Sequence, residues 1–523
     1  MLQETLEQKQ AENDTIGTAI ALRNLALIYG KIGQPQQAKQ ALTESLALVE
    51  SQSPTPEQQR LLAQIFEVEG QLNQATGQAE TALESWKKAN QFYQQVNDTL
   101  GMARAKIGQT QALKTMGMHQ QANEHLDSLN QQLAEESDTL IKAQALQLLG
   151  DVKRAIGQTQ DAQNALEKGL AIAQTLTHKE QVTSILISLG NTARFNVNNT
   201  TEDQEQEQAK ANAFQTALNY YRQAANNAPS LELKVQAQLN ELSVLAEQKD
   251  IATLQALLPT LQQQLTQLNA NRTTLYAQLN FAKTLMQLEE TVIPPTQLAQ
   301  MLAKGVKQAQ SIEDKNAEAR LWVSLGQLYE KNQRYSEAKT ATEKGVLLAQ
   351  ALNAPEIAYQ GQWQLGRILR QQEQRKSAIA AYDKAVTTLQ SLRNDLVAIN
   401  PDFQFSFRES VEPVYRQYVD LLLQPEQPSP DNLKEARSAI EALQLAELDN
   451  FFQDACLNVQ EQAIDQIDSE SAIFYTIILR DRLEVIVALP GQPLRNYSTI
   501  LPKAEIEETL SKMREYIADP QIH

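Results

Sequence analysis

The chain has 523 residues, of which 42% are hydrophobic, 21% charged and 5% aromatic, and its formal net charge is -17. Such an acidic chain is a poor general ligand for nucleic acid or for an anionic membrane, because both bind through clustered Lys and Arg. The single cysteine, Cys456, excludes an internal disulfide and a multi-cysteine metal site. We therefore expect no cofactor, no metal and no nucleic-acid partner.

The N-terminal residues are polar. The stretch MLQETLEQKQ lacks the apolar core of a signal peptide, and no apolar run in the chain approaches the roughly 20 residues that span a bilayer. From Met1 as the start, the sequence predicts a cytoplasmic protein without membrane contact.

A pattern of small residues repeats along residues 19–399. The pair Leu-Gly recurs, 40 residues apart within each close pair, at Leu149-Gly150, Leu189-Gly190, Leu325-Gly326 and Leu365-Gly366. In most units a second small residue follows 12 positions later and a large one four positions after that, as at Ala162 and Leu166. These spacings are helical rather than strand-like. We predict about nine helix pairs, in which small residues allow close approach and the large residue fills the remaining gap.

This pattern resembles the tetratricopeptide repeat, whose signature is W-x2-L-G-x2-Y, then A-x3-F, then P. The best match comprises Trp322, Leu325, Gly326, Tyr329, Ala338 and Gly345. The resemblance covers about residues 19–390 and implies an all-α, right-handed solenoid. It departs in its period, which is about 40 rather than 34 residues and which longer helices would explain. The alternative is an unrelated helical bundle with accidental periodicity.

Two segments depart from the repeat. Residues 1–18 align with the second helix of a unit, so we expect a partial repeat or an N-terminal cap helix there. The fifth unit carries a 15-residue insertion near Asn196–Lys210 (NVNNTTEDQEQEQAK), which has no apolar periodicity and is predicted to be a mobile loop.

The first helices of successive units would line the concave face of such a solenoid. Positions three, four and three residues apart on these helices form one stripe, which in this chain is rich in amides. Amides both donate and accept hydrogen bonds and therefore suit an extended peptide backbone. The predicted partner groove consists of Arg104, Gln111, Lys114, Gln144, Asp151, Arg154, Asn191, Arg194, Asp250, Glu290, Arg320, Gln327, Glu330, Arg367 and Arg370. We expect a scaffold that binds a protein or an extended peptide, without catalysis and without a small-molecule substrate.

The last position of the stripe changes sign along the chain. It is basic at Lys114, Arg154 and Arg194 and acidic at Asp250, Glu290 and Glu330. One interpretation is local, because a cation near a helix C-terminus complements the helix dipole by about 0.3–1 kcal/mol; it leaves the acidic residues unexplained. The other is a groove with a basic half and an acidic half that binds a partner of complementary polarity. Both interpretations stay open.

The sequence pattern changes after residue 400. Residues 400–469 are expected to hold two more helices, separated by the proline-rich linker Gln424–Pro430. Ala472–Leu479 and Leu483–Leu489 are β-branched apolar runs, which predict a hairpin. A loop at Pro490–Pro493 and a helix near Lys503–Ala518 follow.

From Phe407 on, the sequence resembles the beginning of a CHAT domain, the caspase-like domain attached to tetratricopeptide arrays in bacteria. The matching residues are Phe407-Arg408-Glu409, Tyr415, Leu421–Leu423, Ala436-Arg437, Ile440-Glu441, Gln444, Glu447-Leu448 and Phe451-Phe452. The resemblance implies a helical linker over 400–469 and the N-terminal fragment of a CHAT-like domain over 470–523.

CHAT peptidases use a His-Gly motif and an A-C-x-[TS]-like motif, in which the histidine assists a thiolate nucleophile. Neither motif occurs in this chain, and Cys456 is interpreted as an ordinary cysteine at a helix end. The domain would therefore be truncated before its catalytic residues. Beside a scaffold, two alternatives stay open: the regulatory N-terminal part of a peptidase whose catalytic portion is absent here, and a catalyst with an unrecognised site.

Overall fold

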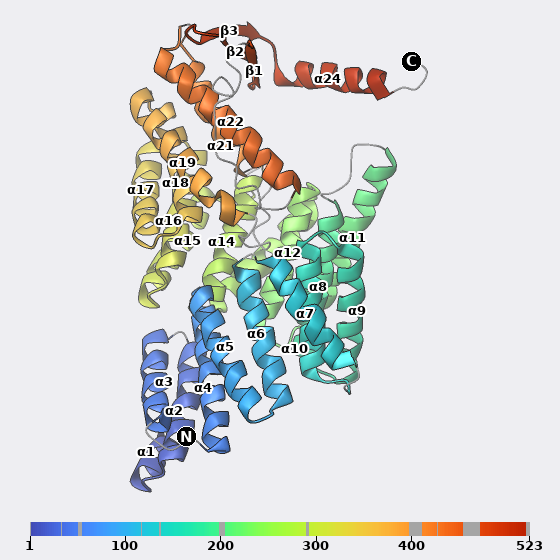
Figure 1. Ribbon diagram of the computed structural model, residues 1–523, viewed down its shortest axis with the longest axis vertical. Helices are drawn as coiled ribbons and strands as arrows, with labels where there is room; N and C mark the ends of the chain where they lie inside the picture. Colours follow the sequence, from blue (N-terminus) through green and yellow to red (C-terminus); the bar gives the residue numbers. More distant parts are fainter. Residues whose placement is uncertain are drawn as a thin grey trace. The chain divides into compact units, whose positions relative to one another are not determined.

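The computed structural model describes residues 2–32, 34–50, 55–116, 118–134, 137–197, 204–288, 292–396, 410–425, 427–452 and 471–518. These residues form two compact units. The first runs from α1 (Leu2–Ala11) to α16 (Lys315–Lys331), and the second from α17 (Tyr335–Ala351) to α24 (Lys503–Ala518) (Figure 1). Helices dominate both units. None of the helices in these residues is both long and apolar enough to cross a membrane.

Nine helix pairs follow one another in the described residues, which confirms the predicted all-α solenoid. Their first helices are α2 (Thr15–Lys31), α4 (Pro56–Ala75), α6 (Thr99–Thr115), α8 (Leu140–Ala155), α10 (Lys179–Val197), α12 (Leu231–Glu247), α14 (Arg272–Gln287), α16 and α18 (Pro355–Gln371). Their second helices are α3 (Pro35–Glu50), α5 (Ala79–Gln95), α7 (His119–Ala134), α9 (Thr159–Thr175), α11 (Gln204–Asn227), α13 (Ile251–Gln267), α15 (Pro295–Ser311), α17 and α19 (Arg375–Leu396). Helix α1 packs against α2.

Several first helices begin at a residue whose side chain caps the helix. The carboxylates of Asp14, Asp98 and Asp314 each accept a hydrogen bond from the backbone N–H three residues later, at 2.8, 2.8 and 2.9 Å. Thr55 and Gln58 form a reciprocal capping box at the start of α4. Such caps satisfy N–H groups that have no partner within the helix, so they fix where each first helix starts.

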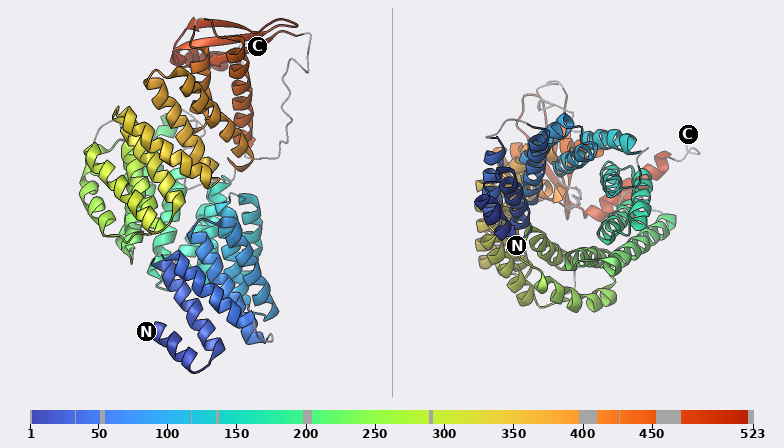
Figure 2. Two further views of the ribbon diagram at one scale, coloured as in Figure 1. Left: turned by 90° about the vertical axis from the view of Figure 1, so that its left-hand side faces the viewer. Right: turned by 90° about the horizontal axis from the view of Figure 1, so that it is seen from below.

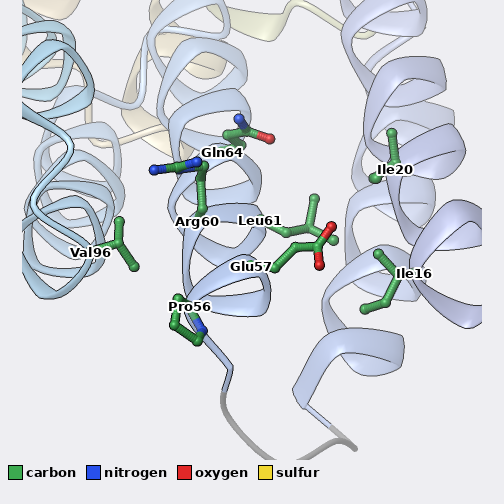
Figure 3. A pocket seen from close by; sticks show the side chains of 8 residues that line it. All are labelled: Ile16, Ile20, Pro56, Glu57, Arg60, Leu61, Gln64 and Val96. Atoms are coloured by element: carbon green, nitrogen blue, oxygen red, sulfur yellow. The ribbon is translucent and has the colours of Figure 1, made fainter.

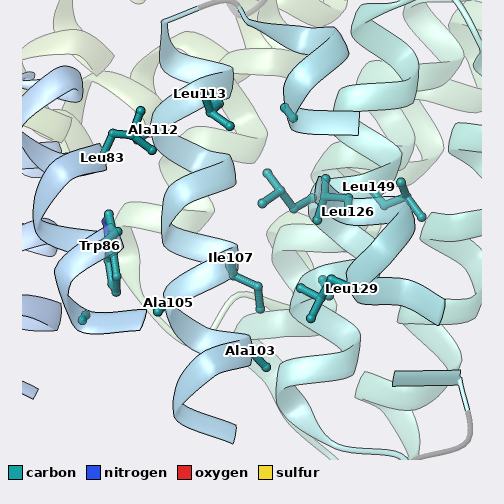
Figure 4. Close-up of a cluster of buried hydrophobic side chains, with 14 of the residues drawn as sticks. Leu83, Trp86, Ala103, Ala105, Ile107, Ala112, Leu113, Leu126, Leu129 and Leu149 are labelled. Carbon is teal, nitrogen blue, oxygen red and sulfur yellow. The ribbon is translucent and has the colours of Figure 1, made fainter. Parts of the chain in front are cut away.

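Small residues on the first helices lie directly against large residues on the second helices. A Cβ atom added to Gly70 would lie 2.7 Å from Trp86, and one added to Gly150 would lie 2.5 Å from Leu166. Tyr221 and Tyr382 take the same place against Gly190 and Gly366. Trp86 also contacts the next repeat, because a Cβ at Gly108 would lie 2.2 Å from its ring. Figure 4 shows the resulting core, in which side chains of α5, α6, α7 and α8 fill the space between the helices.

The helix pairs of the first unit follow a curved path that returns on itself (Figure 2, right). Arg272, at the start of α14, donates a hydrogen bond of 3.4 Å to the backbone carbonyl of Thr76, just beyond the end of α4. The same guanidinium pairs with Asp314 at 3.0 Å. Gln36 of α3 donates a 3.1 Å hydrogen bond to Glu313. The first two repeats therefore contact the loops of the seventh and eighth.

The insertion of the fifth unit differs from the predicted mobile loop. Helix α10 extends to Val197, and α11 begins at Gln204, so residues 204–210 form the first turns of a 24-residue helix. The reason is the high helix propensity of the run EQEQAK, which needs no apolar face to extend an existing helix. Residues 198–203 lie outside the described residues.

In the second unit, α21 (Glu412–Leu423) and α22 (Pro430–Phe452) pack on each other, and α21 packs against α19. The amide of Gln417 on α21 accepts hydrogen bonds from Trp363 on α18 at 2.9 Å and from Tyr382 on α19 at 3.0 Å. The Tyr382 and Tyr418 rings stack with their centroids 6.4 Å apart. Helix α21 thus continues the array beyond the ninth pair.

The predicted hairpin is part of a three-stranded antiparallel sheet with the order β1-β2-β3. Strand β1 (Ile473–Ile478) pairs with β2 (Arg482–Ala488), and β2 pairs with β3 (Arg495–Ile500). Strand β3 was not predicted. Its sequence, RNYSTI, is largely exposed and therefore lacks the apolar alternation by which a half-buried strand is recognised. The final helix begins and ends as predicted.

A chain of ion pairs joins the ninth repeat to the sheet. Asp420 on α21 lies 2.7 Å from Arg370 on α18 and 2.7 Å from Arg482 on β2. Arg482 lies 2.5 Å from Glu484, whose side chain is 1% exposed. Asn496 and Ser498 of β3 donate hydrogen bonds to Glu484 at 3.1 and 3.0 Å. The network therefore links α18, α21, β2 and β3 through their side chains.

Substitution of Gly70 by Val should destabilise the first unit by roughly 1–3 kcal/mol, because the added atoms meet the buried ring of Trp86. The exposed neighbour Gln71 on the same helix provides the control, since Gln71→Val adds a β-branched residue without a steric conflict. Thermal unfolding followed by circular dichroism measures both. Equal melting temperatures for the two variants would contradict the packing described above.

Substitution of Arg482 by Met should destabilise the second unit by about 3–5 kcal/mol, because it leaves the Glu484 carboxylate buried without its cation. The double substitution Arg482→Met with Glu484→Met should recover most of the loss, since it removes both charges. Hydrogen exchange of β1 and β2 reports the effect locally. A single variant as protected as the parent chain would show that the ion pair is not needed.

Candidate functional site

The first helices of consecutive repeats pack directly on one another throughout the first unit, from α2 with α4 to α14 with α16. Helices that approach one another more closely lie on the inner side of a curved array. The stripe predicted from the sequence lies on these helices, so the inner face of the first unit is the candidate interaction surface. We call it the inner face below.

Charged side chains on the inner face pair with the neighbouring repeat. Arg104 lies 3.2 Å from Glu67, and Lys114 lies 3.5 Å from Asp151. Both pairs are separated by 37 residues. Since the repeat has a period of about 40 residues, a spacing of 37 places Asp151 one helical turn earlier on the next first helix, and Glu67 one helical turn later on the preceding first helix. The side chains of Lys114 and Asp151 are only 17% and 14% exposed, so water screens this pair weakly.

Arg194 follows the same rule at the lengthened fifth unit. It pairs with Glu247 of α12 and donates a 3.0 Å hydrogen bond to Ser243. Arg154 is buried, with 4% of its surface exposed. The three basic positions therefore lie within the array and contact or adjoin other repeats, so they do not form an open basic surface.

The acidic positions do not form a matching surface. Asp250 lies beyond the end of α12 and caps α13, where it accepts a 3.1 Å hydrogen bond from the N–H of Thr253. The hydrogen bonds that the side chain and the backbone N–H of Thr253 donate to this carboxylate lower the pKa of Asp250. Its predicted place on the stripe of the first helices is wrong, because α12 ends before reaching it. Glu290 lies outside the described residues, and Glu330 is half-buried in the last turn of α16.

The other predicted residues divide between bonded and exposed side chains. Asn191 accepts a 2.8 Å hydrogen bond from Tyr221 and one of 3.4 Å from Asn240. Arg320 donates to Asn316 at 3.1 Å. Gln144 is half-buried, whereas Gln111 and Gln327 are exposed. In the second unit, Arg367 lies over the Trp363 ring at 4.4 Å, and Arg370 belongs to the network with Asp420.

A polar cluster crosses α2, α4, α5 and α6 on the inner face. The buried Tyr93 donates a 2.5 Å hydrogen bond to Glu67, and Arg104 donates a 3.3 Å hydrogen bond to the same phenol oxygen. Burial raises the pKa of Tyr93, and the Glu67 carboxylate raises it further, so the phenol remains protonated. Arg23 on α2 bonds to Gln64 on α4 and, at 2.8 Å, to Asn24. These contacts hold the first three repeats in a fixed relation.

Four glutamines at one position of the repeat have exposed side chains with no hydrogen bond or ion pair in the described part of the chain: Gln71, Gln111, Gln287 and Gln327. They come from α4, α6, α14 and α16, where they directly follow Gly70, Thr110, Met286 and Gly326. Gln111 and Gln327 were predicted site residues. Their amides remain available for a ligand.

A cleft of about 410 Å³ opens at the N-terminal ends of α2 and α4. It is lined by Ile16, Ile20, Pro56, Glu57, Arg60, Leu61, Gln64 and Val96. Figure 3 shows Ile16 and Ile20 on α2 facing Leu61 and Glu57 on α4, with Arg60 and Val96 on the other side of α4. The sequence prediction missed this cleft because the stripe was followed only from the second repeat onward. An isoleucine where later repeats carry polar residues is the signal that could have revealed it.

The described residues contain no group of three or more His, Cys, Asp or Glu side chains placed to hold a metal ion. Cys456 and His523 lie outside them. His119 begins α7, and His178 accepts a 3.2 Å hydrogen bond from the N–H of Gln181 through Nδ1, which is a capping contact. Neither histidine belongs to a metal-binding group in the described residues.

The comparisons with known proteins agree with the repeat. The family model described as the tetratricopeptide repeat matches residues 319–351 and 359–388, which span α16–α17 and α18–α19. These segments include the six residues that match the signature best in the sequence. A search of curated protein sequences finds no match.

Three solved structures share a general likeness with the chain. A Rap protein complexed with competence and sporulation factor has 13% identity and a TM-score of 0.41, covering 72% of this chain and 99% of its own. The apo form of RapI has 10% identity and a TM-score of 0.34, covering 64% and 98%. BtubC from P. vanneervenii has 14% identity and a TM-score of 0.30, covering 53% and 91%. At these scores the likeness carries no conclusion about function.

Acidification should destabilise the third and fourth repeats through His119. Burial, together with the nearby charges of Lys114 and Arg154, lowers the pKa of this imidazole to about 4. In the unfolded chain the imidazole has its ordinary pKa of about 6.5 and binds more protons between pH 6.5 and 4, so stability falls as the pH drops through this interval.

Denaturant unfolding at pH 7 and pH 5 measures this effect. The parent chain should lose about 1–2 kcal/mol more than His119→Gln over this interval. His125, which is exposed on the same helix, supplies the control, and His125→Gln should leave the pH dependence unchanged. An identical loss in the parent chain and in His119→Gln would contradict the assigned environment.

Proposed function

We propose that the chain is a non-catalytic scaffold of the tetratricopeptide type, which holds an extended peptide segment of a partner protein on its inner face. The observation that carries this proposal is a glutamine amide that is exposed and without a hydrogen bond in the described residues, at one repeat position on two pairs of adjacent first helices, α4 with α6 and α14 with α16. The charged residues of the same stripe are paired within the array. Recognition by hydrogen bonding to a backbone, rather than by charge, therefore fits this surface.

The spacing of the amides suits an extended chain. Packed helices lie about 8–10 Å apart, and an extended peptide advances about 3.3 Å per residue. A peptide that crosses adjacent first helices would thus meet one amide for about every three residues. Each amide can donate to a carbonyl and accept from an N–H group, so contacts do not depend on the side chains of the ligand.

A photoreactive amino acid at position 111 tests the proposal in the native lysate. The matched control carries it at Gln120, which is exposed on the second helix α7 of the same repeat. We expect one partner to be captured from position 111 and also from position 71, but not from position 120. Equal capture from all three positions would contradict binding on the inner face.

The captured partner then allows a quantitative test. Substitution of both Gln71 and Gln111 by Ala should weaken its binding by about tenfold or more, because each lost hydrogen bond contributes about 1 kcal/mol. Unchanged affinity in the double variant would show that the amides do not contact the partner.

We propose, as a second candidate, that the chain is the regulatory part of a CHAT-like caspase-type peptidase whose catalytic portion is supplied elsewhere. The sheet favours this candidate, because β1 and β3 each have an unpaired edge and its outer surface exposes Phe474 by 64% and Tyr497 by 55%. Open edges and exposed apolar surfaces are sites where further strands or domains pack. A photoreactive residue at the exposed Thr476 should then capture a peptidase. Capture of no peptidase there would rule against this candidate.

A further inference from the structure

The inner face of the first repeat differs chemically from that of every later repeat. Ile20 on α2 is 37% exposed and occupies a position that is polar in the eight units that follow. The equivalent residues are Gln64, Arg104, Gln144, Ser184, Asn240, Asn280, Arg320 and Gln360. Ile16, one turn earlier, extends the apolar surface. The exposed isoleucine is thus a local feature of this end of the array.

These isoleucines form one wall of the cleft of about 410 Å³ described above. Leu61, which is 4% exposed, Pro56 and Val96 also line it, with Val96 across α4 from the isoleucines (Figure 3). The volume is sufficient for one large aliphatic or aromatic side chain together with part of its backbone. The cleft is also continuous with the amide-bearing face, because Gln64 lines it and lies on the same helix as Gln71.

The charges at the cleft do not cancel. Arg60 is paired with Asp98 at 3.6 Å. Glu57 is exposed, and its carboxylate has no ion pair or hydrogen bond in the described part of the chain. The cleft therefore offers an apolar surface beside one uncompensated negative charge, on a chain whose net charge is -17. Such a surface is complementary to an apolar side chain beside a cation.

We propose that this cleft binds an aliphatic or aromatic side chain of a partner peptide whose neighbouring residue is Lys or Arg. The proposal rests on the proposed function, since it gives the chemistry of the segment that lies at the N-terminal end of the inner face. The apolar side chain occupies the space between Ile16, Ile20 and Leu61, and the cation pairs with Glu57. The amides of the following repeats then bind the backbone of the same peptide.

A defined peptide tests this assignment on the full chain. The probe is a fluorescein-labelled decapeptide with one central Leu flanked by Lys in a background of Ser and Gln, and its binding is measured by fluorescence anisotropy. Replacement of the central Leu by Ser should weaken binding by about tenfold or more, because the apolar contact is lost. Replacement of the flanking Lys by Glu should weaken it several-fold at low salt and less at 0.5 M salt.

Variants of the protein locate the binding. Ile20→Gln introduces the residue that several later repeats carry at this position, so the fold should tolerate it, and binding of the Leu peptide should fall by about tenfold. Glu57→Gln should remove the preference for Lys over Glu at the flanks. Leu347→Gln is the control, because it removes an aliphatic side chain that is 69% exposed on α17. It should leave binding unchanged.

Three results would overturn the proposal: no binding of the Leu peptide to the parent chain, equal binding of the Leu and Ser peptides, or full binding to Ile20→Gln. A change of mass in light scattering for Ile20→Gln would instead assign the cleft to a second copy of the chain, which also overturns it. If Gln71→Ala with Gln111→Ala weakens the captured partner while Ile20→Gln does not, the scaffold stands and the cleft assignment fails. The reverse result, in which only Ile20→Gln weakens binding, would contradict the role of the glutamine amides and support the cleft assignment.

Discussion

The close approach of the two helices in each pair is the constraint on which the rest of the structure depends. A glycine or another small residue on the first helix lies against one large side chain of the second, as Gly70 does against Trp86 and Gly366 against Tyr382. A helix pair alone cannot bury this core, so each pair stacks on the next, and Trp86 packs against Gly108 of the following repeat as well. The same contact sets which helices lie on the inner side of the curve and hence which side chains can meet a ligand.

The inner face contains two classes of polar side chain with different tasks. Charged residues such as Lys114 and Arg104 pair with the following and the preceding repeat, respectively, and stabilise the stacking of the first helices. Amides such as Gln111 have no partner in the described part of the chain and remain exposed. The division follows from desolvation, because a partly buried charge needs a nearby counter-charge, whereas an exposed amide remains hydrated until a ligand replaces the water. In the proposed cleft at the end of the array, Glu57, which has no ion pair in the described residues, would select for a cation.

The repeat itself could be predicted from the sequence, because the Leu-Gly pairs and the large residue 16 positions later record a steric contact. The exposed Gln111 and Gln327 were predicted for the same reason, since their position follows from the repeat. The roles of Lys114 and Arg194 could not be predicted from single positions, because they depend on acidic residues of the next repeat. Asp250 was misplaced because the end of α12 is set by a cap and not by the period. Strand β3 and the Arg482–Glu484 pair depend on tertiary contacts for which the local sequence carries no pattern.

We propose that the charges of the inner face stabilise the array and that its uncharged amides bind the partner. A double-mutant cycle on Lys114 and Asp151 tests it most directly, with hydrogen exchange of α6 and α8 and affinity for the captured partner measured on the same four proteins. We expect a coupling of about 1 kcal/mol or more in the local free energy of opening, and unchanged affinity in all variants. Additive effects on stability, together with a loss of affinity in Lys114→Ala, would contradict it.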